Sequence, residues 1–182
     1  DDKEKRSTEM TAEGFYLLDD NNERITKPYI YIEPDDVYHG YELSRFIGEN
    51  GLYGYLSIET GKEIISPQYT KASEFRDGAA LVSEGDGIYY ITEEGERFTS
   101  GYYLDGYEFS ETQGSFARVQ MEDETWAIID RDENILLSGC DKLPELPDVT
   151  DVGCAIKEGH AILFQLSRDD ENETPGRILH EY

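Results

Sequence analysis

Residues 51–69 read GLYGYLSIETGKEIISPQY, and this stretch decides the fold. An alternating aromatic and aliphatic segment is followed by a polar turn with Gly61, then by a second aliphatic segment that ends at Pro67. Glycine tolerates the positive φ of a tight hairpin turn, so Gly61 is expected at the turn. Proline removes a donor from the ladder, so Pro67 is expected where the second strand leaves the sheet. The stretch therefore predicts a β-hairpin.

The same pattern recurs three more times along the chain, in GFYLLDDNNERIT (14–26), GIYYITEEGERF (87–98) and TWAIIDRDENILL (125–137). The four expected turns carry Asn21-Asn22, Thr60-Gly61, Glu94-Gly95 and Asn134. A third strand precedes each later copy, and it is clearest in FRDGAALV (75–82). Related segments are GYELSRF (40–46), GSFARV (114–119) and GCAI (153–156). The unit is therefore predicted to be three short antiparallel strands.

The spacing of the copies is that of a repeat array. The steps between Phe15, Tyr53, Ile88, Trp126 and His160 are 38, 35, 38 and 34 residues. Periods of roughly 20 to 50 residues are typical of arrays in which neighbouring units share a core. We therefore expect an all-β domain over residues 14–166, without a helix. Its units are expected at about 14–50, 51–86, 87–124 and 125–159, with a partial unit at 160–166.

Polar tails are expected at both ends, over residues 1–13 and 167–182. Two arrangements of the units are open. One is an open stack of three-stranded meanders, which we favour because the unit lengths vary and the last unit is incomplete. The other is a propeller-like ring, for which about four blades are the minimum.

Residues 53–82 resemble the WG repeat, a bacterial β-rich repeat named after a Trp-Gly pair. Tyr53-Gly54-Tyr55-Leu56 stands for the opening motif, Gly61 for the turn and Pro67-Gln68-Tyr69 for the exit. Phe75, Gly78, Ala80 and Val82 complete the pattern. The copies that begin at Phe15, Ile88 and Trp126 are more divergent. The resemblance implies an array of β-units in a secreted or surface bacterial protein, and it implies no established chemistry.

The charge of the chain limits its partners. Its net charge is −25, from 41 acidic and 16 basic residues. Binding to nucleic acid or to an anionic membrane needs the opposite charge, so both partners are disfavoured. No apolar run approaches the roughly 20 residues that span a bilayer. A cationic protein partner suits the charge. Because the chain begins with Asp1-Asp2, we expect that an upstream signal or anchor has been removed, and an extracellular or cell-surface location.

The two cysteines form a candidate disulfide. Cys140 and Cys154 occupy the repeat positions of Tyr102 and Phe116, and each pair is separated by 14 residues. If the two positions face each other, a disulfide would replace an aromatic contact, and a loop of that size is worth about 3 kcal/mol in the chain-entropy model. The alternative is a pair of buried free thiols.

A candidate calcium site lies in DRDEN (130–134), where Asp130, Asp132 and Asn134 alternate and Asp141 falls twelfth in the count. This spacing partly copies that of a calcium loop. Ile135, however, stands where such a loop needs glycine. The competing interpretation is a solvated hairpin turn.

A tyrosine-rich segment is the candidate binding surface, with Tyr102, Tyr103 and Tyr107 in GYYLDGYEF (101–109). Aromatic rings stack on sugars and anchor protein interfaces, and they also pack between repeats. No histidine pairs with a nucleophile in a recognisable pattern, so no catalytic residue is expected. We expect a non-catalytic module that serves as a protein-binding or spacer surface. The alternative is a carbohydrate-binding or carbohydrate-cleaving domain that uses tyrosines and carboxylates.

Overall fold

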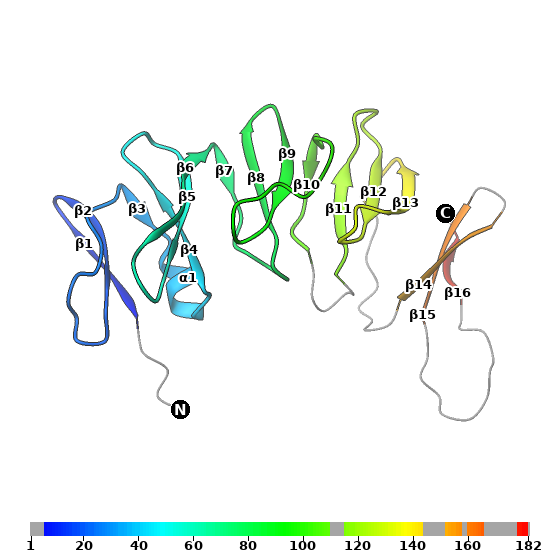
Figure 1. Ribbon diagram of the computed structural model, residues 1–182. Helices are drawn as coiled ribbons and strands as arrows, with labels where there is room; N and C mark the ends of the chain where they lie inside the picture. Colours follow the sequence, from blue (N-terminus) through cyan, green and yellow to red (C-terminus); the bar gives the residue numbers. More distant parts are fainter. Residues whose placement is uncertain (1–5, 110–114, 144–151, 158–159, 166–177, 182) are drawn as a thin grey trace, which may run out of the picture. The chain divides into compact units, whose positions relative to one another are not determined.

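The computed structural model describes residues 6–109 and 115–143, and it describes the backbone of 152–157, 160–165 and 178–181. The regular secondary structure of the described chain is almost entirely β with antiparallel pairing, and none of its sheets closes into a barrel (Figure 1). It divides into two compact units, Asp1–Tyr102 and Tyr103–Tyr182. They are called the N-terminal and C-terminal units below.

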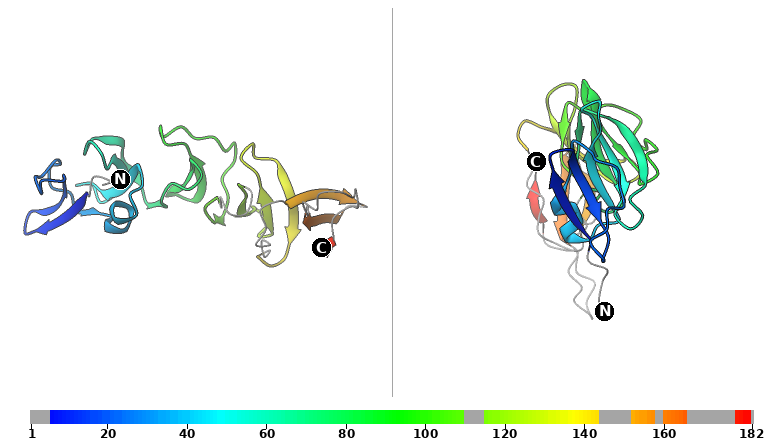
Figure 2. Two further views of the ribbon diagram at one scale, coloured as in Figure 1. Left: turned by 90° about the horizontal axis from the view of Figure 1, so that it is seen from below. Right: turned by 90° about the vertical axis from the view of Figure 1, so that its left-hand side faces the viewer.

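The N-terminal unit holds three sheets. The first pairs β1 (Ser7–Thr11) with β2 (Gly14–Leu18). The second has the order β3 (Tyr31–Ile32), β4 (Leu43–Ile47), β5 (Tyr53–Ser57) and β6 (Glu63–Tyr69). The third has the order β7 (Lys71–Ala72), β8 (Ala80–Gly85) and β9 (Gly87–Ile91). The strands of each meander lie side by side in every view (Figure 1, Figure 2).

The C-terminal unit repeats the meander. One sheet has the order β10 (Asp105–Gly106), β11 (Ala117–Gln120), β12 (Trp126–Ile129) and β13 (Ile135–Cys140). The other has the order β14 (Val152–Lys157), β15 (His160–Gln165) and β16 (Ile178–Glu181). The three predicted strands are complete in the meanders β4–β5–β6 and β11–β12–β13. After β2 and after β9 the predicted second strand is reduced to an isolated bridge, Leu18–Arg24 and Ile91–Arg97. Three sheets add a two-residue edge strand, β3, β7 or β10, that is too short to leave a pattern in the sequence.

The glycine of the opening motif has a steric role. Tyr53 pairs with Tyr69 and Tyr55 with Ile65, so β6 carries two extra residues opposite Gly54. A Cβ atom on Gly54 would lie 2.5 Å from the Ile65 carbonyl oxygen and 2.8 Å from the Pro67 nitrogen. Gly54 thus lets this bulge pack directly against β5. The expectation that Pro67 ends the strand was wrong, because β6 continues through the bulge to Tyr69.

The hairpin turns follow the predicted positions with one correction. Positive φ angles occur at Asn22 (60°), Gly61 (68°), Gly95 (82°) and Glu133 (61°). The prediction of Asn134 for the last turn was wrong by one residue. Glu133 takes the left-handed position because its amide donates to the Asp130 carbonyl, while the Asp130 amide donates to the Asn134 carbonyl. Hydrogen bonding of the turn outweighs the modest cost of this conformation for a non-glycine residue.

The expectation of no helix was also wrong, because α1 (Pro34–His39) forms between β3 and β4. Pro34 lies at its first turn, Asp35 and Asp36 complement the N-terminal dipole, and Gly40 (φ 70°) caps the C-terminus. These signals are visible in the sequence, but six residues make fewer than two helical turns, too few for a repeated apolar face to show. The expected tails contain two strands, since β1 pairs with β2 and β16 with β15.

Neighbouring sheets of the N-terminal unit share their cores. One cluster joins the first two sheets through Leu17, Tyr29, Ile32, Val37, Phe46, Leu56 and Ile58. A second joins the next two through Tyr55, Ile65, Tyr69, Phe75, Ala80, Val82, Tyr89 and Ile91. A meander of this size buries too little apolar surface by itself, so sharing a core is what stabilises the array.

Candidate binding groove

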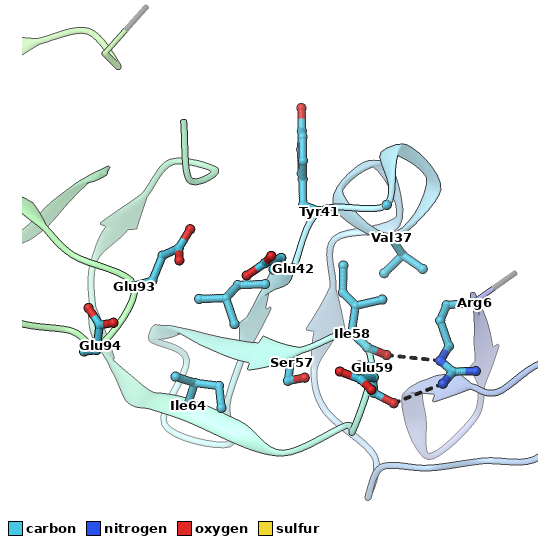
Figure 3. A pocket seen from close by; sticks show the side chains of 12 residues that line it. Arg6, Val37, Tyr41, Glu42, Ser57, Ile58, Glu59, Ile64, Glu93 and Glu94 are labelled. Carbon is cyan, nitrogen blue, oxygen red and sulfur yellow. Dashed lines mark hydrogen bonds between the residues drawn. The ribbon is translucent and has the colours of Figure 1, made fainter. Parts of the chain in front are cut away.

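A groove of about 670 Å³ opens on the N-terminal unit, between the end of α1, the start of β4 and two of the repeat turns (Figure 3). Its aliphatic lining consists of Val37, Leu43, Ile58 and Ile64. Its acidic lining consists of Glu42, Glu59, Glu93 and Glu94. An apolar floor with carboxylates around it can bind a group that is both apolar and cationic.

The two turns that line the groove are hairpin turns of the repeat. We name the hairpin turns of the N-terminal unit turn 1 (19–22), turn 2 (57–61) and turn 3 (92–95), and the groove is lined by turns 2 and 3. In each, the amide of the positive-φ residue donates to the carbonyl of the first residue, over 3.0 Å in turn 1, 2.8 Å in turn 2 and 2.9 Å in turn 3. Counted from the first residue of each turn, Ile58-Glu59 of turn 2 and Glu93-Glu94 of turn 3 are equivalent positions, and turn 2 holds one residue more before its glycine. The groove lies between these two copies.

The acidic side chains of the groove act on one another. Burial raises the pKa of Glu93, and the negative charges of Glu42 and Glu94 raise it further. A hydrogen bond with the Thr92 side chain lowers the pKa of Glu94, which stays ionised. Glu93 therefore experiences a local excess of negative charge, and a cation entering the groove would relieve it.

Arg6 lies at the far side of turn 2, just before β1. Its Nε donates to the Ile58 carbonyl at 3.3 Å and its Nη2 to the Glu59 carbonyl at 3.1 Å. Its Nη1 pairs with the Asp20 carboxylate of turn 1 at 2.6 Å. Figure 3 shows this side chain on one side of turn 2, with Glu93 and Glu94 on the other. Arg6 thus links two consecutive repeat turns.

The predicted aromatic surface divides between the two units. In the N-terminal unit, Tyr102 is 52% exposed, and the Arg97 guanidinium lies 4.1 Å from its ring centre. In the C-terminal unit, Tyr103 is buried and its hydroxyl donates to Glu133 at 2.8 Å. Tyr107 is 41% exposed, and the Arg118 guanidinium lies 4.5 Å from its ring centre. Arginines of the chain itself therefore cover the two exposed rings on one face.

The residues of the calcium hypothesis form the turn after β12. The Asp130 carboxylate accepts from the Asp132 amide at 3.0 Å, the Asn134 amide at 2.8 Å and the Asn134 side chain at 2.9 Å. Asp19 holds turn 1 in the same way. Within the described residues, no group of three or more His, Cys, Asp or Glu is placed to hold a metal ion. The geometry explains Asp130 as the acceptor of a turn, and calcium binding remains a prediction.

The Cys140 thiol is free and half-buried in the structure. Burial raises its pKa, and the negative charge of Asp141 adds to this. The side chain of Cys154 lies outside the described residues, and the Cys140–Cys154 disulfide remains a prediction.

Sequence patterns did not single out the groove. Glu42, Glu93 and Glu94 are ordinary acidic residues of a solvated turn or strand end when they are considered one at a time. Aligning the repeats would have placed Ile58-Glu59 beside Glu93-Glu94, but Glu42 and Arg6 reach the turns only through the fold.

The comparison with protein families matches residues 53–87 to the family described as "WG containing repeat". The chain contains a WG repeat. The match covers β5 to the start of β9 and confirms the family suggested by Tyr53-Gly54 and the residues that follow. No curated protein matches the chain.

Solved structures give only weak likenesses. The computationally designed Ika8 protein is 10% identical (TM-score 0.44), with 90% of this chain and 53% of that one covered. BamB from Moraxella catarrhalis is 13% identical (TM-score 0.40), with 100% and 62% covered. A protein of unknown function from Bacteroides caccae is 15% identical (TM-score 0.30), with 97% and 71% covered. This chain thus spans about half to two thirds of the first two, and scores this low indicate no function. In the described part of the chain, no helix is long and apolar enough to cross a membrane.

Proposed function

We propose that this WG-repeat chain is a non-catalytic module of an exported bacterial protein, and that it binds a basic segment of a protein partner in the groove. The observation that carries the proposal is the groove's composition, with aliphatic side chains on its floor and four glutamates around them. Charge complementarity then selects a cationic occupant, and the apolar floor selects one with aliphatic side chains beside its charges.

The charge of the whole chain supports the same partner. A net charge of −25 attracts a basic segment over long distances and speeds its association, most strongly at low salt. Ile64 supplies an apolar anchor at the groove, since its side chain is 46% exposed while the neighbouring Ile65 is buried.

A glycan partner is the weaker proposal. Sugar binding by stacking needs a free aromatic face. Arg97 lies over the Tyr102 ring and Arg118 over the Tyr107 ring, so one face of each is already covered within its own unit.

The proposal is tested with a fluorescein-labelled dodecapeptide of six Lys-Leu pairs, followed by anisotropy, against a matching peptide of six Glu-Leu pairs. The Lys-Leu peptide is expected to bind. Substitution Ile64→Ser should weaken this binding about fivefold, because roughly 1 kcal/mol of apolar contact is lost. The matched control is Ile30→Ser, since Ile30 is 55% exposed and lies outside the groove. Equal binding of both peptides, or equal losses in both variants, would overturn the proposal.

A further inference from the structure

We infer that the groove between turn 2 and turn 3 holds an arginine side chain of the partner, in the place that Arg6 holds one repeat earlier. This inference rests on the proposed function, because it names the group that the same groove takes. It is carried by a cation site that the chain has already built between two of its own repeats.

The Arg6 site shows what the gap between consecutive turns can bind. The guanidinium uses two neighbouring nitrogens on two successive carbonyls, those of Ile58 and Glu59. A third nitrogen pairs with the carboxylate of Asp20 on the preceding turn. The Arg6 side chain is only 14% exposed, so this is a largely enclosed site and the contacts are not those of a loose surface side chain. Charge-assisted bonds of this kind are the stronger class of hydrogen bond.

The next repeat provides the corresponding positions in turn 3, which is one residue shorter than turn 2. Glu93 and Glu94 of turn 3 occupy the positions of Ile58 and Glu59, so their carbonyls are the equivalent acceptors. The position of Asp20 is taken in turn 2 by Ile58, which has no carboxylate. Glu42 supplies the negative charge instead, since it lies between the two turns in Figure 3 and its charge acts on Glu93. Of the described residues that line the groove, Arg6 is the one basic residue, and its guanidinium is already held by the Ile58 and Glu59 carbonyls and by Asp20.

The shape of the Arg6 contacts favours arginine over lysine as the occupant. A guanidinium presents its donors as a planar fork, which suits two successive carbonyls, whereas an ammonium is a point charge on a flexible stem. The methylene groups of an arginine can lie along apolar surface while the head stays at the polar end. Ile58 and Ile64 provide that surface beside the acidic side chains.

The test compares three labelled dodecapeptides of six X-Leu pairs, in which X is arginine, lysine or citrulline. Citrulline keeps the shape of arginine and removes its charge. Arginine is expected to bind roughly threefold more tightly than lysine, and citrulline to lose binding. Glu42→Gln and Glu93→Gln should each weaken binding of the arginine peptide and reduce the difference in affinity between the arginine and lysine peptides. The matched control is Glu96→Gln, an exposed residue just after turn 3 that does not line the groove, which should change nothing.

The outcomes separate this inference from the proposal on which it rests. If the arginine and lysine peptides bind equally and both need Ile64, the protein-binding groove stands and the arginine site falls. If arginine is preferred but Glu96→Gln is as damaging as Glu93→Gln, the arginine site also falls. If no basic peptide binds, both are wrong. Each variant is first shown to unfold at the wild-type urea concentration, so that a loss of binding is not a loss of fold.

Discussion

Replacing Gly54 with alanine tests why the repeat places a glycine beside its first aromatic residue. The added Cβ would lie 2.5 Å from the Ile65 carbonyl oxygen, 2.8 Å from the Pro67 nitrogen and 2.9 Å from a ring carbon of Phe46. Two of these atoms belong to the backbone of β6 and cannot rotate away. The bulge opposite Gly54 must therefore move outward, or the β5–β6 pairing must loosen.

The cost follows from two opposing effects. Overpacking a buried site costs about 1–3 kcal/mol, and contact with backbone atoms places Gly54→Ala near the upper end. Alanine also restricts the unfolded chain more than glycine, which returns about 0.4–1 kcal/mol. The net expectation is a loss of about 2 kcal/mol in the free energy of unfolding. Ala127 occupies the equivalent place in the C-terminal unit, where the bulge in β13 holds only one extra residue. The larger bulge, whose backbone would lie 2.5–2.8 Å from a Cβ on Gly54, is therefore what requires glycine at position 54.

The assay is urea unfolding followed by circular dichroism, with Gly101→Ala as the matched control. Gly101 does not have a positive φ, and a Cβ added there would have no atom within 4 Å apart from its chain neighbours. This change should therefore be neutral or slightly stabilising. A Gly54→Ala protein whose free energy of unfolding lies within about 0.5 kcal/mol of the wild type would refute the steric role of the glycine.

Two further predictions concern buried polar groups. Asp36 is 1% exposed, and its carboxylate accepts hydrogen bonds from the Arg45 amide, Nε and Nη2 at 2.9, 2.9 and 2.8 Å. Asp36→Asn leaves the Arg45 guanidinium without its buried counter-charge, so urea unfolding should show a loss of about 3 kcal/mol in the free energy of unfolding. Asp35→Asn, on the exposed side of the same helical turn, should cost under about 0.5 kcal/mol, and equal losses would contradict the role of the Asp36–Arg45 pair. Burial, reinforced by Glu63 and by Glu84, raises the pKa of Tyr29 and of Tyr89 above the ordinary 10.0. As pH rises, the two tyrosines of the unfolded chain therefore lose their protons before those of the folded chain. Their contribution to the free energy of unfolding should be fully present below pH 10 and should fall as pH rises above it. Unfolding free energies that stay constant from pH 9 to pH 11 would count against this.

The hairpins were predictable because their determinants are local. The turn glycines Gly61 and Gly95 and the alternating pattern of YGYLSI can each be recognised from a few consecutive residues. The two-residue strands and α1 were missed because none is long enough to repeat its pattern twice. β1 was taken for a tail because STEMT is polar, and its place depends on pairing with β2 and on the contacts of Arg6 with turn 2.

The groove was not predictable for a different reason. Its residues come from positions 6, 37–43, 57–64 and 93–94, and no local rule relates these segments. The repeat period relates turn 2 to turn 3, but the approach of Glu42 and Arg6 depends on how β4 and β1 lie against the turns. The requirement for glycine at position 54 was also not predictable from neighbouring residues, because it comes from the backbone of Ile65 and Pro67 on the adjacent strand.

The most direct test of the groove is an NMR titration of the ¹⁵N-labelled chain with the Arg-Leu dodecapeptide. If the groove takes a basic side chain, the largest amide shifts fall on turn 2 and turn 3, at Ile58, Glu59, Glu93 and Glu94, and Glu93→Gln reduces them. Shifts centred on Tyr102 or Tyr107, with turn 2 and turn 3 unchanged, would place binding on the aromatic surface and contradict the account.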